Sequence, residues 1–361
     1  MQAVPEAGVL MLNFGEPEEA TLEAVTPFLE RIFYNNAPLE AFATDAERQA
    51  RSEMLAQRRA PGLVADYERI GGSPLAAQAR QQAVMVEVAL RERGHAVKSY
   101  VGMQFTEPTI AEAVASAHRD GVTRLIGLPV FPLCGTSTNV AALNDVQKAL
   151  DAMGWDVPFH PITGWHFHPK YVTLRTENIR QYAEDEGLDL DDPDTLLYFS
   201  AHGTPIKYLA AGSRYDGYVE EHCRQIAEAL GGLAYTIGYQ NHSNRGIAWT
   251  LPDNADHIKT LAAKRLVVVP ISFVHEQSET LSELDLDFKE EVEAEGMTMH
   301  RVPVPHDDPA LGEALADLAM PFLRDEAPAT HGLHPCRCRP KAGTVCTNGH
   351  RTVACYATAM S

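Results

Sequence analysis

Strand-sized apolar runs alternate with helix-length segments over most of this chain of 361 residues. The apolar runs are nearly continuous, as in strands buried on both faces, whereas the longer segments repeat their apolar residues every three or four positions. Such alternation predicts βαβ units and parallel sheets with helices on both sides. The expected strands are Gly8–Phe14, Ala96–Met103, Thr123–Phe131, Leu196–Ala201, Leu233–Gly238, Arg265–Val274 and Met297–Val304. The expected helices are Leu75–Arg93, Ile110–His118, Asn139–Met153, Pro169–Glu186, Tyr218–Leu230, Glu276–Glu295 and Pro309–Leu323.

The alternation divides into two similar blocks. A proline-rich turn at Val157–Gly164 separates them, and a chain of this length usually holds about two domains. We therefore expect an α/β fold with two Rossmann-like, doubly wound parallel-sheet domains, over residues 8–160 and 161–325. Residues 326–361 are rich in Pro, Thr, Gly, His and Cys, have no apolar period and form a separate tail.

Charge and motif content exclude several classes of function. The formal net charge of −19 disfavours general attraction to nucleic acid or anionic lipid. The longest apolar stretches are strand-sized, and Met1–Ala7 lacks the basic and apolar regions of a signal peptide. We therefore expect a cytoplasmic protein, with peripheral contact to the inner membrane left open. The chain contains no G-x-G-x-x-G, Walker A or G-x-S-x-G sequence, which argues against dinucleotide binding and serine hydrolysis.

Two strand ends carry candidate catalytic side chains. The run Leu196–Ala201 leads into His202, and a glycine, a threonine and a proline then end the strand. Because doubly wound sheets bind ligands at the carboxyl ends of strands, His202 is either a metal or proton ligand or a hydrogen-bonded structural histidine. The run Arg265–Val274 leads into acidic residues at helical spacing, which form either a solvated helix face or a path for a hydrated cation. These residues are Glu276, Glu279, Glu283, Asp287 and Glu290.

Several segments together resemble the ferrochelatase family over nearly the whole chain up to Leu323. They are Gly8–Gly15, Ile70–Leu75, Val101–Met103, Leu128–Pro132, Ser200–His202, Tyr239–Gln240 with Trp249, and Glu279–Leu281. Each motif alone is a weak signal, whereas their order and spacing make the resemblance specific. Four places depart from the usual pattern: Gln277 stands where many members have histidine, Gln104 where arginine is common, and the runs 129–135 and 212–215 differ from the family's usual segments.

The resemblance implies a lyase that inserts Fe²⁺ into protoporphyrin IX or coproporphyrin III in haem biosynthesis. Porphyrin and ferrous iron are then the expected partners, and monomer and homodimer both stay open. The implied catalytic residues are His202 and Glu279. The implied metal-handling residues are His202, Glu279, Glu283 and Asp287. The implied porphyrin contacts are Phe14, Ser73 and Trp249.

Two other functions stay open at this point. A tetrapyrrole chelatase for cobalt would use the same fold, although the resemblance implies that such enzymes tend to place a second histidine where this chain has Glu279. A non-catalytic porphyrin- or haem-binding carrier would need no proton-accepting carboxylate such as Glu279 beside His202. The propionates of a porphyrin would suit the arginines expected at the pocket lip, which otherwise form a solvated helix face. They are Arg48, Arg51, Arg58 and Arg59.

The tail carries four cysteines, which are Cys336, Cys338, Cys346 and Cys355. In a protein without an export signal, such a cluster is more typical of a metal site than of disulfides. Some ferrochelatases end in a tail that binds a 2Fe–2S cluster, with one ligand sometimes supplied by the first domain, for which Cys134 is the candidate here. Zinc is the main alternative, because three histidines lie in the same tail. Free thiols are the third interpretation.

Overall fold

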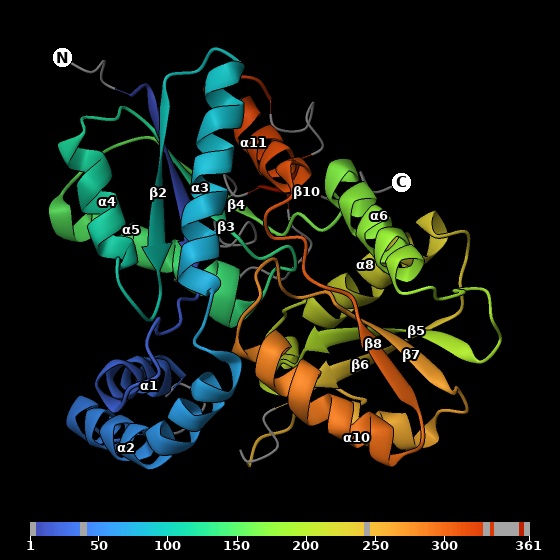
Figure 1. The fold of residues 1–361 in the computed structure, drawn as a ribbon. Coiled ribbons are helices and arrows are strands. Elements are labelled where there is room, and N and C mark those ends of the chain that lie inside the picture. Colours follow the sequence, from blue (N-terminus) through green and yellow to red (C-terminus); the bar gives the residue numbers. More distant parts are fainter. Residues whose placement is uncertain (1–4, 37–41, 242–245, 328–332, 336–353, 357–361) are drawn as a thin grey trace.

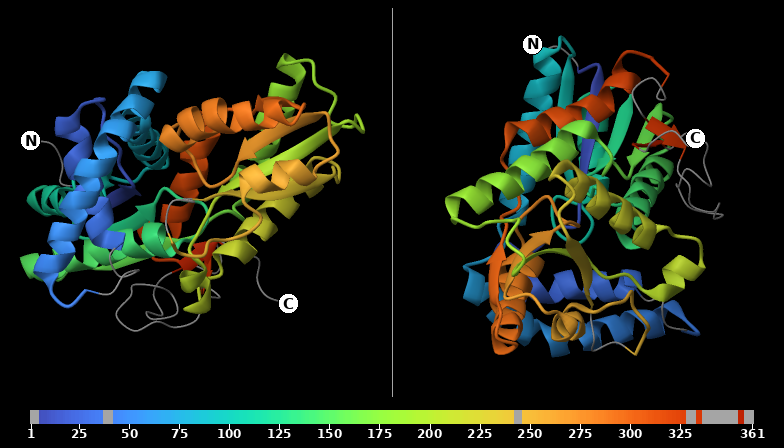
Figure 2. Two further views of the ribbon diagram at one scale, coloured as in Figure 1. Left: turned by 90° about the horizontal axis from the view of Figure 1, so that it is seen from below. Right: turned by 90° about the vertical axis from the view of Figure 1, so that its right-hand side faces the viewer.

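Two sheets of mainly parallel strands form the two halves of the molecule (Figure 1). The structure is a computed structural model that describes residues 5–36, 42–241, 246–327, 333–335 and 354–356. Helices cover both faces of each sheet, as the views in Figure 2 show from two further directions. The expected α/β class with two Rossmann-like, doubly wound sheets is therefore confirmed, whereas the division of the chain at residue 160 stays a prediction.

The first sheet is buried on both sides. Its strand order is β2-β1-β3-β4-β10-β9, and the bounds are β1 Ala7–Asn13, β2 Val97–Met103, β3 Leu125–Pro129, β4 Phe159–Thr163, β9 Leu333–Pro335 and β10 Ala354–Tyr356. Along β1, Val9 and Met11 pack with helices α3 and α11, whereas Leu10 and Leu12 pack with α4 and α5. Both faces of the strand are therefore apolar, which explains its unbroken apolar run. The four helices are α3 Leu75–Glu92, α4 Ile110–Arg119, α5 Ala141–Met153 and α11 Pro309–Leu323.

The second sheet repeats this arrangement with four parallel strands in the order β6-β5-β7-β8. They are β5 Thr195–His202, β6 Tyr235–Gln240, β7 Arg265–Pro270 and β8 Thr298–Arg301. On one face, Phe199 packs with helix α8 (Tyr215–Ala229). On the other face, Tyr198 packs with Leu284 and Phe288 of η4 (Glu279–Phe288), a π-helical segment that continues into α10 (Lys289–Ala294).

Helices α1 (Leu22–Asn36) and α2 (Asp45–Ile70) were not expected from the sequence and lie side by side below the first sheet in Figure 1. The buried side of α2 begins with the small residues Ser52, Ala56 and Ala60, and large apolar side chains, such as Leu63 and Tyr67, pack beyond them, so the apolar period is weak over the first part of the helix. The remaining segments are η2 Thr136–Val140, α6 Pro169–Asp185, α7 Ile206–Ala210, α9 Asn254–His257 and η3 Ile258–Thr260.

The proline-rich stretch 157–164, expected to be a turn, instead contains strand β4. This strand pairs with β3 through Phe159, His160 and Pro161, and β10 joins its other side at Ile162 and Thr163. The expectation of a turn was wrong because a proline is tolerated in a strand where no neighbouring strand needs its N–H group.

Helix α11 returns from the second half of the chain to the first sheet. Its residues Leu311, Leu315 and Leu318 belong to the same apolar core as Val9 and Val86. The first sheet therefore obtains part of its core from residues that follow the second sheet in the sequence.

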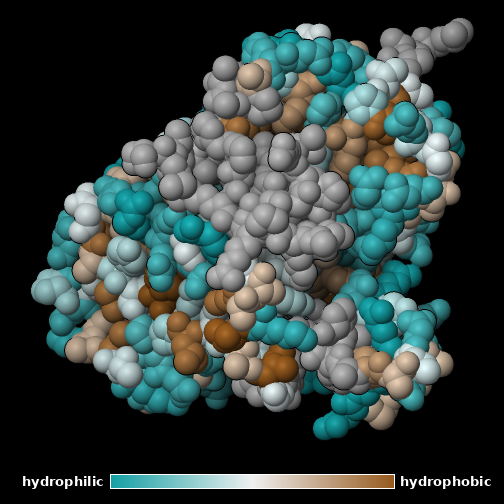
Figure 3. Space-filling view, turned by 180° about the vertical axis from the view of Figure 1, so that it is seen from behind, coloured by the Kyte–Doolittle hydropathy of each residue, from teal (hydrophilic) through white to brown (hydrophobic). Residues whose placement is uncertain are grey.

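Hydrophilic residues predominate on the face shown in Figure 3, and hydrophobic residues lie among them singly or in small groups. Among the described residues, no helix is long and apolar enough to span a membrane.

Candidate active site

His202 is the last residue of β5, and its backbone pairs with Gln240 at the end of β6. The imidazole is half-buried and faces the ring of Phe273 edge-on, with 6.2 Å between the ring centroids. The structure therefore places His202 at the carboxyl edge of the second sheet, as its sequence position predicts.

Two hydroxyl groups fix the backbone of His202. Its N–H donates to Ser272 Oγ at 2.9 Å, and the Tyr215 hydroxyl donates to its carbonyl oxygen at 3.0 Å. Ser272 Oγ and the Tyr215 hydroxyl also contact each other at 2.9 Å. These contacts connect β5 to the segment after β7 and to the first turn of α8, so the histidine backbone is held from three elements.

One hydrogen bond determines which tautomer the neutral imidazole of His202 adopts. Its Nδ1 lies 2.7 Å from the carbonyl oxygen of Gly203. Because a carbonyl can only accept a hydrogen bond, Nδ1 carries the proton and Nε2 carries the lone pair. Gly203 is required here, since a Cβ atom at this position would lie 1.8 Å from Asn241 Oδ1. The neutral ring therefore has its basic nitrogen at Nε2.

Gln240 connects His202 to the predicted carboxylates. Its backbone pairs with His202, and its side-chain amide donates to the backbone carbonyl of Glu279 at 2.9 Å. The same amide nitrogen lies 3.3 Å from Glu283 Oε2. His202, Glu279 and Glu283, which are far apart in the sequence, are thus brought to one edge of the sheet.

The two carboxyl groups are held in an environment that favours their protonated forms. Burial raises the pKa of Glu279 above its usual value. Burial and the neighbouring charge of Glu279 raise the pKa of Glu283 to about 8. A carboxyl group with a pKa near that of Glu283 can accept and release protons near neutral pH.

The acidic stripe is shorter than the sequence spacing suggests. The helix begins at Glu279 rather than at Glu276, and its first ten residues are π-helical. A π-turn holds more residues than an α-turn, so side chains four residues apart, such as Glu279, Glu283 and Asp287, come nearly into line. Asp287 lies at the exposed end and forms a 3.0 Å ion pair with Arg69 of α2.

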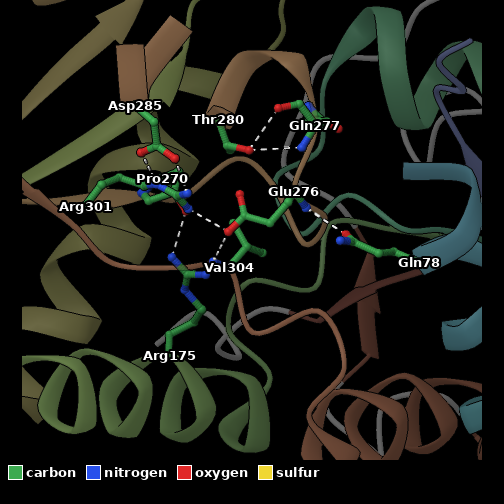
Figure 4. Close-up of polar contacts among 9 residues, drawn as sticks. All are labelled: Gln78, Arg175, Pro270, Glu276, Gln277, Thr280, Asp285, Arg301 and Val304. Carbon is green, nitrogen blue, oxygen red and sulfur yellow. Dashed lines mark hydrogen bonds and ion pairs between the residues drawn. The ribbon is translucent and has the colours of Figure 1, made fainter. Parts of the chain in front are cut away.

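Glu276 does not belong to this stripe, and its expected place beside Glu279 was wrong. Figure 4 shows its side chain in a buried polar network that includes Arg301. Its Oε1 accepts from Arg301 Nη1 at 2.6 Å and from the Val304 backbone N–H at 2.8 Å. Its own N–H donates to Gln78 Oε1 of α3 at 2.8 Å. A helical wheel cannot place this residue because the helix starts only three positions later.

The predicted porphyrin contacts lie in three different surroundings. Phe14 packs against Phe105, with 4.5 Å between the ring centroids. Trp249 is half-buried, and its backbone bridges to Pro205, three residues after His202. The Ser73 hydroxyl is buried and donates to Glu16 Oε2 at 2.5 Å.

Glu16 is a site residue that the sequence reasoning missed. It lies after the carboxyl end of β1, only 4% of its surface is exposed, and burial together with the charge of Glu279 raises its pKa to about 7. The signal was available, because the strand-end argument that selects His202 applies equally to an acidic residue three positions after β1.

Among the described residues, no group of three or more His, Cys, Asp and Glu side chains is placed to hold a metal ion. Cys336, Cys338 and Cys346 lie outside the described residues, and of Cys355 only the backbone, in β10, is described. The backbone of Cys355 pairs with Thr163 of β4, whose hydroxyl donates to the sulfur of the buried Cys134 at 2.7 Å.

The chain matches known proteins along most of its length. A family model described as Ferrochelatase covers residues 6–322. A ferrochelatase from Picosynechococcus sp. is 33% identical over 344 residues, which cover 91% of this chain and 86% of the relative. A ferrochelatase from Trichodesmium erythraeum is 32% identical over 337 residues, which cover 88% and 82% respectively. Among solved structures, that of CbiX, described as the terminal enzyme for biosynthesis of sirohaem in denitrifying bacteria, is 16% identical, with a TM-score of 0.46, and the match covers 86% of this chain and 96% of that one.

Proposed function

The chain belongs to the ferrochelatase family, and we propose that it inserts ferrous iron into a porphyrin with His202 and Glu279 at the reaction centre. It is then a metal-inserting lyase of haem biosynthesis whose substrates are Fe²⁺ and a porphyrin. The observation that carries the assignment of residues is the Gln240 bridge, which brings the strand-end histidine and the first carboxylate of η4 to the same edge.

The reaction releases two protons from the macrocycle, one from each pyrrole N–H group, and the nitrogen lone pairs then bind the metal. His202 is suited to accept a proton or to bind the metal at Nε2. The hydrogen bond from Nδ1 to the Gly203 carbonyl leaves the lone pair of the neutral ring on Nε2. Glu279 is suited to accept a pyrrole proton, since burial raises the pKa of its carboxyl group and so makes it a better base. Imidazole and carboxylate are also ordinary ligands for a divalent iron that sheds its water.

Glu283 and Asp287 continue from Glu279 towards the surface. Glu279 and Glu283 are half-buried and Asp287 is exposed, so the row of carboxylates reaches solvent at Asp287. We assign the outer two to the delivery of hydrated iron, because negative charge along a path raises the local concentration of a cation.

A direct assay tests the function. Purified protein is mixed anaerobically with Fe²⁺ and either protoporphyrin IX or coproporphyrin III, and formation of the metalloporphyrin is followed by its absorbance. Turnover with one of the two porphyrins is expected and identifies the substrate. Tight porphyrin binding without turnover would indicate a carrier, and turnover with Co²⁺ but not with Fe²⁺ would indicate a cobalt chelatase.

We further propose that the tail binds a 2Fe–2S cluster through Cys336, Cys338, Cys346 and Cys355, with Cys134 as the alternative for one of them. What supports this is the register of β10, which pairs Cys355 with Thr163, the residue whose hydroxyl contacts the Cys134 sulfur. Thiolates are the usual ligands of such clusters.

Metal analysis of anaerobically purified protein tests the cluster. A red-brown colour with about two iron atoms and about two acid-labile sulfides per chain is expected, and Cys338→Ser should bleach it. Colourless protein with stoichiometric zinc would indicate that the tail binds zinc and not a 2Fe–2S cluster. Cytoplasmic location, peripheral membrane contact and the choice between monomer and homodimer stay predictions.

A further inference from the structure

Glu16 follows β1 of the first sheet, but its side chain contacts Ser278, which directly precedes Glu279 in the second half of the chain. The chain leaves β1 through Gly15, whose φ of +86° favours glycine. A Cβ atom on Gly15 would also lie 2.9 Å from Met103 Cβ, so no other residue fits this turn without displacement. The turn brings the Glu16 carboxylate into the interior, where 4% of the residue is exposed.

Three hydrogen bonds hold the Glu16 carboxylate. Ser73, just before α3, donates its hydroxyl to Oε2 at 2.5 Å. Ser278 donates its backbone N–H to the same oxygen at 3.2 Å and its hydroxyl to Oε1. Both oxygens of Glu16 are therefore used, and two of the three donors come from the residue that directly precedes Glu279.

Ser278 connects Glu16 to Glu279. Its Oγ contacts Glu16 Oε1 and also lies 3.1 Å from Glu279 Oε2. A serine hydroxyl has one hydrogen and can donate to only one carboxylate at a time. The hydroxyl thus stands between the two carboxylates, and Glu16 competes with Glu279 for its hydrogen.

Neighbouring contacts show that the whole segment before Glu279 rests on the first half of the molecule. Gln78 of α3 accepts from the Glu276 N–H at 2.8 Å (Figure 4), and Gln82 Nε2 donates to the Val274 carbonyl at 2.8 Å. Glu16 is the acidic member of this set. The residue that it contacts, Ser278, directly precedes Glu279 in the sequence.

We propose that Glu16 is a positioning residue for iron insertion, which acts across the boundary between the two sheets by fixing Ser278 and, through it, the orientation of the Glu279 carboxylate. This inference rests on the proposed function, because it assigns Glu16 to the reaction in which Glu279 takes part. Burying a carboxylate beside another is costly unless it is well hydrogen-bonded, and the three hydrogen bonds to Glu16 offset this cost while they tie it to Ser278.

A double-mutant cycle tests the proposal on the full-length protein. The four proteins are the wild type, Glu16→Ala, Ser278→Ala and the double variant, and each is assayed for kcat, for the porphyrin KM and for its unfolding temperature. We expect Glu16→Ala to lower kcat between about ten-fold and a hundred-fold, the scale of a misplaced catalytic group, with the porphyrin KM within about two-fold of the wild type. In the Ser278→Ala background, the same change should cost less kcat than in the wild type, because the hydroxyl contact is already lost and only the backbone N–H of residue 278 still donates to Glu16.

Conservative and control variants complete the design. Glu16→Gln retains an acceptor oxygen and should recover part of the lost kcat. Glu18→Ala changes an exposed glutamate of the same loop, which pairs with Arg80 at 2.9 Å, and should leave kcat unchanged. If Glu16→Ala is unfolded, Glu16→Gln and Ser278→Ala carry the same comparison.

The outcomes separate this inference from the proposed function. Full kcat in folded Glu16→Ala, or an equal loss in both Ser278 backgrounds, overturns the positioning role while iron insertion by the wild type stands. If the wild type inserts no iron, the proposed function fails. The unfolding temperatures of the same four proteins still report whether Glu16 and Ser278 are coupled in the folded state. Additive shifts would show that the two side chains do not interact.

Discussion

Arg301 Nη1 lies 2.6 Å from Glu276 Oε1, and both side chains are about nine-tenths buried, with 9% and 11% of their surfaces exposed. The same guanidinium contacts both carboxylate oxygens of Asp285 within η4. One arginine at the end of β8 therefore holds both the loop before Glu279 and the helical segment that begins with it.

Replacing this arginine should destabilise the protein strongly. Arg301→Met leaves the buried Glu276 carboxylate without its cation, and breaking a buried pair from one side costs about 3–5 kcal/mol. Urea or thermal unfolding measures the loss. Arg265→Met is the matched control on β7, because its pair with Asp192 is 3.5 Å long and about one-third exposed, and we expect it to cost less than about 1 kcal/mol. Equal losses in the two variants would contradict a special role for Arg301.

His202→Ala should abolish metal insertion and leave the fold intact. The substitution removes the Nε2 lone pair, whereas the contacts of Ser272 and Tyr215 are to the His202 backbone and survive. Insertion assays and far-ultraviolet circular dichroism measure the two effects. His118→Ala, at an exposed position on α4, serves as the control. Near-normal turnover by folded His202→Ala would remove the imidazole from the mechanism.

Glu279→Gln should lower the insertion rate by at least about a hundred-fold, the scale of a lost proton-transfer group. The amide keeps the shape of the side chain but cannot accept a pyrrole proton. Porphyrin affinity, measured by fluorescence titration, should remain near the wild-type value. Glu290→Gln, an exposed glutamate on α10, should behave as the wild type. A variant that lost affinity but not rate would mark Glu279 as a binding residue.

Glu283→Gln and Asp287→Asn should raise the iron concentration needed for half-maximal rate more than they lower kcat. Asp287→Asn removes a negative charge from the exposed end of η4, and Glu283→Gln removes the carboxylate that forms as Glu283 loses its proton near pH 8, so both changes affect delivery of the cation rather than proton transfer. Asp287 also pairs with Arg69, so Arg69→Met separates loss of the ion pair from loss of the carboxylate. An unchanged iron dependence would leave the stripe as a solvated helix face.

The raised pKa of Glu283 should make stability depend on pH. Its pKa is about 8 in the folded protein against 4.5 for an ordinary carboxyl, so between these values the folded state binds more protons than the unfolded state. The free energy of unfolding contributed by this group therefore falls as pH rises from about 4.5 to about 8.

Glu283→Gln removes this titration. Its unfolding temperature should exceed that of the wild type at pH 8, and the difference should shrink as the pH is lowered towards 4.5, where Glu283 is protonated in both states. The comparison isolates Glu283 from Glu16, whose pKa near 7 contributes with the same sign in both proteins. A difference independent of pH would mean that Glu283 titrates normally.

The sequence predicts those parts of the structure that depend on local pattern. Strands such as β1 and β5 are apolar on both faces, so their runs are visible without knowledge of the fold. His202 is predictable because glycine and proline end its strand at the edge where ligands bind. The same reasoning does not predict β4, because its one proline, Pro161, is tolerated only through the particular pairing of the neighbouring strands.

The contacts that build the site depend instead on tertiary structure. Gln240 and Glu279 are 39 positions apart, and nothing in either local pattern shows that they meet. Glu276 fits an α-helical period with Glu279, yet the helix starts after it and the side chain turns to Arg301. Glu16 is one acidic residue in a polar loop until Ser278 is placed against it.

Helix α11 determines the order in which the molecule can be made. Its leucines complete the core of the first sheet, yet they follow β1 to β4 and the whole second sheet in the chain and are among the last described residues to leave the ribosome. During synthesis, β1 to β4 emerge with part of one face still bare, and that face stays exposed to solvent while about 150 further residues are added at roughly 5–20 residues per second. The N-terminal half can therefore reach its final packing only after translation of the C-terminal half, and an interrupted nascent chain would present a hydrophobic surface for chaperones to bind.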